Sequence, residues 1–281
     1  MTQTPPAKPP VPAARARTGL AGVLIQALQG LHGASSWLAF LAAAFLALPL
    51  LAVLPPLRWR RAVVRQVARL TLAAGGMRLA VSGVDTLPHP SVVVANHASY
   101  LDGIVLTACL PPDFGFVIKR EMNSVPLAAW LLRLIGAEFV ERGGQGATAR
   151  DALRVVRLAA RGHALVFFPE GTFGRVPGLL HFHRGAFAAA ARAGLPVVPT
   201  VIRGTRACLA PGTLLPRAGR IEVKFLEALR PDGASRDADA TLRDHVRARI
   251  LQQLDETDLA PQEPGRDGIM SAARPLETSK G

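Results

Sequence analysis

Hydrophobic positions from residue 78 onward form short apolar runs that alternate with longer stretches of helical periodicity. The short runs predict β-strands at 91–95, 114–118, 137–140, 164–168 and 197–202. The stretches between them predict helices at 101–110, 125–135, 145–161 and 185–193. A late edge strand at 220–225 and a terminal helix at 242–254 follow. This alternation predicts an α/β domain over 78–255, with a mostly parallel central sheet that is flanked by helices.

A different pattern precedes that domain, because residues 18–57 contain no Asp, Glu, Lys or Arg. Within this segment, 37–54 is an apolar run of 18 residues. A helix of that length rises about 27 Å, close to the ~30 Å of bilayer hydrocarbon. We therefore predict an N-terminal membrane-embedded helical segment over 18–57, as a single span or as a re-entrant hairpin bent at 30–33. A buried helix of a soluble protein and a cleaved signal peptide are the alternatives.

The anchor is followed by a predicted basic amphipathic helix over 58–77. Arg61, Arg65 and Arg69 recur every four residues, while the valines and leucine between them fall largely on another face. Such a helix is typical of an anionic headgroup surface. An ordinary helix packed on a core shows the same pattern and is the alternative.

Composition and charge indicate which partner the protein binds. The 281-residue chain carries 33 Lys+Arg against 20 Asp+Glu, a net charge of +13, and residues 1–80 hold nine basic and no acidic residues. Because this excess surrounds an apolar segment, we expect membrane lipids as the partner and no nucleic acid. The basic terminus 1–17 and the tail 256–281 are expected to be disordered. The two cysteines lie far apart in the chain and are interpreted as reduced, buried thiols.

The first polar cluster, residues 96–102 (NHASYLD), directly follows the strand predicted at 91–95. In open α/β sheets, ligand groups gather where strands end and helices begin. If His97 lies on the turn and Asp102 in the first helical turn, the carboxylate accepts the Nδ1 proton and Nε2 remains available as a general base. The alternative is structural, with Asn96 as a helix cap and His97 as a surface residue.

The second cluster, residues 168–175 (FPEGTFGR), follows the apolar strand predicted at 164–168. Its glycines allow backbone amides to approach a ligand, and Glu170 needs a partner such as a substrate hydroxyl or an arginine. Basic residues near this cluster and at the end of the strand at 114–118 are candidate phosphate ligands: Arg175, His183, Arg184, Lys119 and Arg120. A glycine-rich turn with an ordinary ion pair, and strand-end charges that reach solvent, are the alternatives.

The sequence lacks the motifs of several other reaction classes. Residues 143–146 (GGQG) lack the Lys-Ser/Thr of a P-loop, and no G-x-S-x-G elbow is present. His181 and His183 have no third ligand nearby in the sequence, so no metal is predicted. The histidine base should therefore activate a hydroxyl that belongs to the substrate.

In order and spacing, these clusters resemble the four sequence blocks of the glycerolipid acyltransferases, in particular the 1-acyl-sn-glycerol-3-phosphate (lysophosphatidate) acyltransferase family. NHASYLD resembles the N-H-x4-D block, FVIKREMNSVP the second block, FPEGTFGR the F-P-E-G-T block and LPVVPTVIRGTR the fourth. The resemblance covers about residues 85–230. One position departs from it, because many members have Arg directly after the Thr of the third block, where this chain has Phe173.

The resemblance implies one-step acyl transfer from acyl-CoA or acyl carrier protein to the sn-2 hydroxyl of 1-acyl-sn-glycerol-3-phosphate (lysophosphatidic acid). The product would be phosphatidic acid, and no cofactor would be needed. His97 would act as the general base and Asp102 as its orienting partner. The substrate-binding residues expected from the clusters and the blocks together are Asn96, Lys119, Arg120, Glu170, Gly171, Thr172, Arg175, Arg184 and Pro199.

Two alternatives to this function stay open. Phe173 favours the same chemistry on another lyso-lipid, such as a lysophospholipid or an amino-acid-derived, lyso-ornithine-type lipid. A non-catalytic membrane lipid-binding protein would keep only the fold. The positive charges at both ends of the anchor place the protein in the cytoplasmic (inner) membrane, with its catalytic domain facing the cytoplasm.

Overall fold

The computed structural model describes residues 20–124, 126–140, 149–233 and 235–260. The predictions for the chain before residue 20 and after residue 260 lie outside the described residues. The first residues of the helix expected at 145–161 lie outside them as well.

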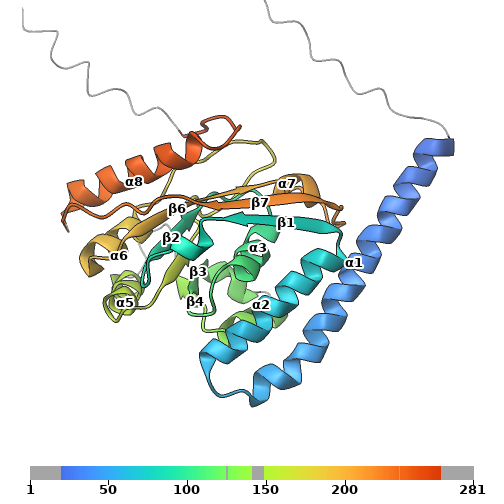
Figure 1. Ribbon diagram of the computed structural model, residues 1–281, viewed down its shortest axis with the longest axis horizontal. Helices are drawn as coiled ribbons and strands as arrows, with labels where there is room; N and C mark the ends of the chain where they lie inside the picture. Colours follow the sequence, from blue (N-terminus) through green and yellow to red (C-terminus); the bar gives the residue numbers. More distant parts are fainter. Residues whose placement is uncertain (1–19, 125, 141–148, 234, 261–281) are drawn as a thin grey trace, which may run out of the picture.

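Two long helices precede the sheet (Figure 1). α1 (Leu20–Val53) has 34 residues, and α2 (Leu57–Ala74) returns alongside it after a short turn. α1 continues through Gly30 and Gly33 without a break, so the hairpin bend expected there is absent. A helical glycine costs only about 1 kcal/mol, and Gly33 is needed because a Cβ there would lie 2.8 Å from the Leu215 side chain.

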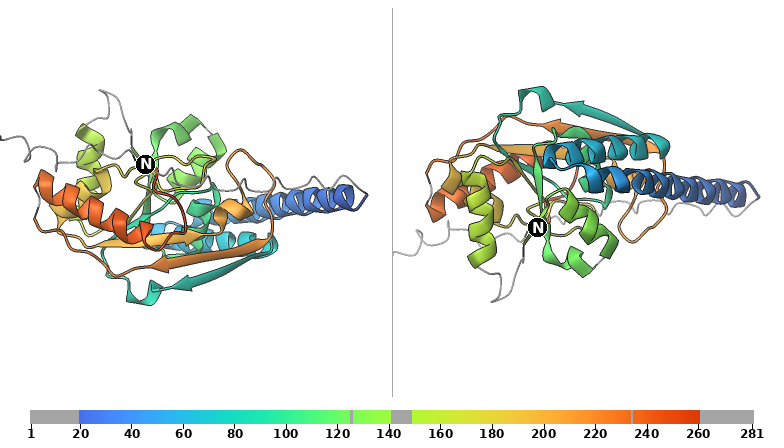
Figure 2. Two further views of the ribbon diagram at one scale, coloured as in Figure 1. Left: turned by 90° about the horizontal axis from the view of Figure 1, so that it is seen from above. Right: turned by 90° about the horizontal axis from the view of Figure 1, so that it is seen from below.

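α1 is also the helix that has the dimensions of a membrane span. Among the described residues, Gly22–Val53 is the one helix long and apolar enough to cross a bilayer, and 17% of its most apolar window is buried. A core helix of a soluble protein would be mostly buried. The low burial therefore favours lipid contact over core packing. Figure 2 shows the first half of α1 extending away from the rest of the molecule.

One sheet of seven strands is formed within the described residues, in the order β1-β7-β6-β2-β5-β3-β4. The strands are β1 (Met77–Ser82), β2 (Val92–Ala95), β3 (Gly115–Lys119), β4 (Glu138–Val140), β5 (Leu165–Phe167), β6 (Val197–Arg203) and β7 (Gly219–Phe225). Neighbouring strands are parallel except β6 and β7, which confirms the predicted mostly parallel α/β sheet.

The sequence prediction for one edge of this sheet is wrong. β7 was expected at the edge, but β1 covers it in parallel along their whole length. The strand β1 reads MRLAVS and buries only Met77, so it lacks the apolar run that marks the other strands.

Helices cover both faces of the sheet (Figure 1). One core lies under α2 and α3 (Leu101–Cys109), and the other lies under α5 (Ala149–Ala160), α6 (Gly185–Ala193) and α8 (Arg236–Leu251). The remaining helical segments are η1 (Val84–Thr86), η2 (Arg120–Ser124), α4 (Pro126–Leu134) and α7 (Thr205–Cys208). Alternate residues of β2 enter the two cores, which explains why this strand is apolar throughout.

The basic face of α2 contacts protein, as the alternative of an ordinary packed helix expects, and its contact with lipid headgroups stays a prediction. The Arg65 Nη2 donates to the Cys109 carbonyl at 3.1 Å, and the Arg69 Nε donates to the Ala108 carbonyl at 2.9 Å. These carbonyls end α3 and carry the negative end of its dipole, which suits guanidinium groups. Arg61 donates to three other carbonyls, those of Asp113, Ile135 and Gly136.

Candidate active site

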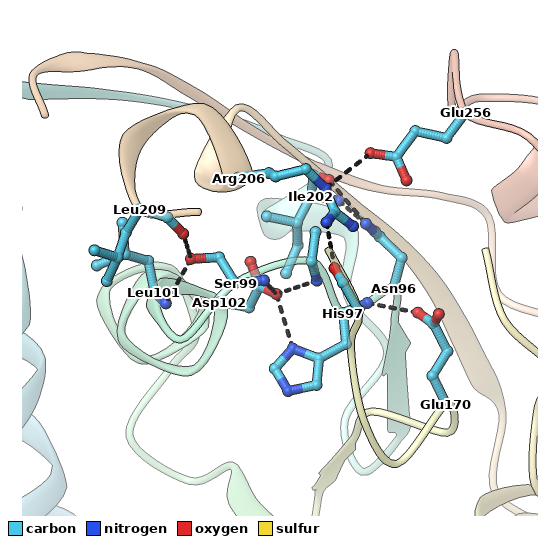
Figure 3. Close-up of polar contacts among 12 residues, drawn as sticks. Asn96, His97, Ser99, Leu101, Asp102, Glu170, Ile202, Arg206, Leu209 and Glu256 are labelled. Atoms are coloured by element: carbon cyan, nitrogen blue, oxygen red, sulfur yellow. Dashed lines mark hydrogen bonds and ion pairs between the residues drawn. The ribbon is translucent and has the colours of Figure 1, made fainter. Parts of the chain in front are cut away.

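Adjacent parallel strands bring the two predicted polar clusters together. β2 lies between β5 and β6, so the loops that follow the carboxyl ends of these three strands are neighbours (Figure 3). Asn96 fixes the first loop to β6, because its Nδ2 donates to the Ile202 carbonyl at 2.9 Å and its Oδ1 accepts from the Ile202 N–H at 2.7 Å. Asn96 is buried, and backbone groups occupy its amide. The structure therefore gives it a positioning role where substrate binding was expected.

His97 and Asp102 form the pair that the sequence predicts. His97 lies on the loop and Asp102 in the first turn of α3, with 2.8 Å between Nδ1 and Oδ2. The same Oδ2 accepts the backbone N–H groups of Ala98 at 2.6 Å and Ser99 at 2.9 Å. Because Asp102 is fully buried, these donors supply the partners that a buried carboxylate requires. The imidazole therefore has a fixed orientation, and 19% of the His97 side chain remains exposed.

Ser99 is a structural residue of this loop. Its hydroxyl donates to the Leu209 carbonyl at 2.7 Å and accepts from the Leu101 N–H at 3.2 Å. Ser99 is completely buried, so its oxygen cannot serve as a nucleophile for an incoming substrate. This leaves His97 as the group in the cluster with chemistry to offer.

Glu170 connects the loop after β5, in which it lies, to the loop after β2. Its Oε1 accepts from the His97 N–H at 2.6 Å and its Oε2 from the Leu180 N–H at 2.8 Å. A substrate hydroxyl or an arginine was expected as the partner of Glu170. The structure has backbone amides in that place, and the Glu170 side chain is only 3% exposed. The pKa of Glu170 is raised to about 7, mainly by burial; the two N–H donors oppose this rise, and the carboxylates of Asp102 and Glu256 contribute to it.

Gly171 makes the turn that follows Glu170 possible. Its φ is +72°, a left-handed conformation that glycine adopts without steric cost, and its N–H bonds the Phe168 carbonyl at 3.1 Å. The turn leaves the next residue, Thr172, exposed at the surface of the site.

Two aromatic rings contact the His97 ring, and a third packs on one of them. The ring of Phe168 stacks on it with centroids 4.3 Å apart, and Phe173 meets it edge-on at 4.4 Å. Tyr100 in turn contacts Phe173 at 4.8 Å. We call Phe168, Phe173 and Tyr100 the aromatic wall. Sequence reasoning singled out only Phe173, although all three lie beside residues of the two motifs.

Lys119 and Arg120 lie at the same edge of the sheet as His97. Lys119 is the last residue of β3 and Arg120 is the first of η2, and β5 separates β3 from β2. Lys119 forms an ion pair with Glu121 at 3.0 Å, and both side chains are substantially exposed. Arg120, at the start of η2, is exposed as well.

Arg175 and Arg184 are directed to other parts of the molecule. The Arg175 guanidinium lies against Gly212 in the loop after α7, where a Cβ would be 2.9 Å from its Nη2. Arg184 is paired with Asp239 of α8, with 3.0 Å between Nε and Oδ1. The structure brings neither guanidinium into the aromatic surroundings of His97.

Pro199 is part of the sheet. It lies inside β6 opposite Val94, and its carbonyl accepts the Leu226 N–H at 2.9 Å. Since it is buried in the sheet, the structure does not support the substrate contact expected for it.

Known proteins are similar to this chain in sequence and in fold. Residues 78–203 match the family described as Acyltransferase. The chain is 32% identical over 231 residues to a 1-acyl-sn-glycerol-3-phosphate acyltransferase alpha of Ovis aries, covering 77% of this chain and 76% of that one. It is 35% identical over 200 residues to a lyso-ornithine lipid O-acyltransferase of Rhodobacter capsulatus, covering 70% and 67%.

Two further similarities bear on length and on fold. A 1-acyl-sn-glycerol-3-phosphate acyltransferase of Saccharomyces cerevisiae is 29% identical over 192 residues, and the chain spans 63% of that relative's length. The crystal structure of the 1-acyl-sn-glycerophosphate acyltransferase PlsC of Thermotoga maritima matches with a TM-score of 0.66 at 21% identity. That match covers 80% of this chain and 95% of the other.

The sheet and the His97–Asp102 pair at its edge define the class as an O-acyltransferase domain. The relatives then specify the family. This chain belongs to the 1-acyl-sn-glycerol-3-phosphate acyltransferase family.

Proposed function

We propose that this protein transfers an acyl group from an acyl thioester to a hydroxyl of a lyso-lipid. The observation that carries the proposal is the 2.8 Å contact between His97 Nδ1 and Asp102 Oδ2 on a partly exposed imidazole. A carboxylate in this position fixes the tautomer in which Nε2 is unprotonated and able to accept a proton at neutral pH. A non-catalytic lipid-binding protein would have no use for that arrangement.

The reaction needs only the substrates and this pair. Nε2 takes the proton of the acceptor hydroxyl while the oxygen attacks the thioester carbonyl, giving a tetrahedral intermediate. The intermediate collapses to an ester and expels the thiolate, which takes the proton back from the imidazolium. Asp102 stabilises the imidazolium in the interval, because its buried Oδ2 lies 2.8 Å from Nδ1.

We propose two candidate acceptors, and the first is 1-acyl-sn-glycerol-3-phosphate, acylated at its sn-2 hydroxyl to phosphatidic acid. The names of several relatives support this acceptor, as do Lys119 and Arg120 at the active edge of the sheet. A second candidate is a lyso-ornithine-type lipid, which the Rhodobacter relative and the aromatic contact of Phe173 favour. We propose acyl-CoA or acyl carrier protein as donor, since both are acidic and the chain is strongly basic.

We further propose that α1 holds the enzyme at the cytoplasmic face of the inner membrane. Its exposed apolar side chains support this, with Leu31 at 70%, Phe45 at 73% and Leu46 at 74% exposed. A lyso-lipid then reaches the site without leaving the bilayer. Carbonate extraction of membranes tests the location, and release of the protein into the supernatant would contradict it.

The function is tested on membranes that contain the protein and are supplied with mixed lyso-lipids and acyl donors. Mass spectrometry of the products identifies acceptor and donor together. His97→Ala should lower the rate by about 10²- to 10⁴-fold, the usual contribution of a general base. His163→Ala, at an exposed histidine in the turn after α5, is the matched control and should act like the wild type. Substantial activity in His97→Ala would refute the assignment of the base.

A further inference from the structure

The surface next to His97 is aromatic. Phe173 contacts the imidazole at 4.4 Å with an interplanar angle of 64°, and Tyr100 packs on Phe173 at 4.8 Å. Tyr100 is 62% exposed, so the aromatic wall extends from the imidazole out to solvent. A hydroxyl bound at Nε2 therefore has its neighbouring atoms close to these rings.

Arg175 of this turn and Arg206 of α7 have their contacts elsewhere. Arg175 packs its guanidinium against Gly212. Arg206 donates to the Gly174 carbonyl at 2.6 Å and lies 3.8 Å from the Glu256 carboxylate. Both arginines are thus held on the α7 side of the turn, while residue 173 presents its ring to His97.

This arrangement discriminates between acceptors by charge. A phosphomonoester placed against phenyl rings loses water and gains no donor, and the ring face carries partial negative charge. An uncharged amide costs less to desolvate in the same place than a phosphomonoester dianion, and burying methylene surface there is favourable. The wall therefore disfavours an anion beside the reacting hydroxyl and accepts uncharged groups there.

We propose that Phe173 is the residue that sets acceptor selectivity. Its ring directs the site toward a lyso-lipid whose hydroxyl is flanked by uncharged methylene and amide groups, as in an N-(3-hydroxyacyl) amino acid. A cation at position 173 would direct it toward a phosphomonoester. This inference rests on the proposed function, because selectivity has meaning only if the protein acylates lyso-lipids.

The test measures kcat/KM for two acceptors, an N-(3-hydroxyacyl)ornithine and 1-acyl-sn-glycerol-3-phosphate, with one acyl donor. Phe173→Arg and Phe173→Lys should shift the ratio of the two values toward the phosphate acceptor by about 10- to 100-fold, the effect of one charge-assisted hydrogen bond. The shift should appear mainly in KM, because the new cation binds a group that does not react. Phe173→Leu, which keeps the wall apolar, should change the ratio less than about threefold, within the range of a conservative apolar replacement.

Each outcome decides a separate point. Acylation by the wild type with the ratio unmoved in both cationic variants overturns the role of Phe173 and leaves the proposed function intact. A shift of equal size in Phe173→Leu also overturns it, because loss of the ring would then explain the effect. Acylation of neither acceptor by the wild type overturns the proposed function and this inference with it.

Discussion

Two regions of this molecule place charged side chains on the backbone of α3, a carboxylate at its start and guanidinium groups at its end. At the sheet edge, the buried carboxylate of Asp102 accepts N–H groups at the start of α3. On α2, Arg65 and Arg69 donate to carbonyls at the end of the same helix. Both arrangements complement the dipole of α3. They differ in one respect, since Asp102 shares its oxygen with His97, whereas the guanidinium groups are bonded to carbonyls alone. Reactivity in this fold therefore depends on that additional partner.

The largest effect is expected from a change that weakens the contact between Asp102 and His97. Asp102→Asn should lower kcat by about 10²- to 10⁴-fold, because the neutral amide no longer stabilises the imidazolium. The replaced Oδ1 has no hydrogen-bond partner among the described residues, so the new amide also adds an unsatisfied buried donor. The measurement is kcat at saturating acceptor.

A thermal melt accompanies this measurement as its control. It separates lost catalysis from lost folding, since a folded but slow variant is the expected result. Activity within tenfold of the wild type would show that Asp102 serves only α3, as the arginines do, and the contrast between the two regions would disappear.

The pH dependence of unfolding tests whether burial makes the ionised form of Glu170 costly. Its pKa is raised to about 7, from 4.5 in the unfolded chain, so between these values the folded protein holds a proton that the unfolded chain has released. The free energy of unfolding should therefore fall by about 3 kcal/mol as pH rises from 4.5 to 7 and stay level above 7.

Glu170→Gln is the comparison for this pH dependence. It cannot ionise, so urea unfolding as a function of pH should lose the decline between pH 4.5 and 7. The variant is also expected to be less stable by about 1–3 kcal/mol at low pH, because its amide nitrogen faces a backbone N–H donor. An unchanged slope in Glu170→Gln would mean that another group carries the titration.

The sequence predicted the two polar clusters because each directly follows an apolar strand, and their proximity follows from parallel neighbours in a sheet. It failed where the partner of a side chain is a backbone group far along the chain. Glu170 bonds Leu180 N–H, and Asn96 bonds Ile202. No periodicity encodes such contacts. The strand β1 was missed because its sequence MRLAVS lacks an apolar run and buries only Met77.

The arginines of α2 show the same limit. Their spacing of four residues predicts a common face correctly but does not reveal what that face contacts. Arg65→Ala with Arg69→Ala should lower the free energy of unfolding by about 2 kcal/mol, because the last carbonyls of α3 lose charged donors. Binding to anionic vesicles should stay unchanged, and a co-sedimentation assay measures it.

Arg58→Ala is the matched control, because Arg58 is an exposed arginine of the same helix. It should leave stability unaltered. If the double variant stays fully stable and loses vesicle affinity, the basic face serves lipid after all, and the two regions no longer play comparable structural roles at the two ends of α3.

The smallest effect concerns the turn that presents the aromatic wall. Gly171→Ala should cost about 1–2 kcal/mol of stability, because φ of +72° brings a Cβ close to the backbone. Gly174→Ala, three residues on, should be nearly neutral, since its φ is not left-handed and a Cβ there meets no atom within 4 Å. Chemical denaturation of both variants measures the difference. Equal losses would show that the turn needs small residues throughout, whereas a loss confined to Gly171 assigns the geometry of the Glu170 loop to a single backbone angle.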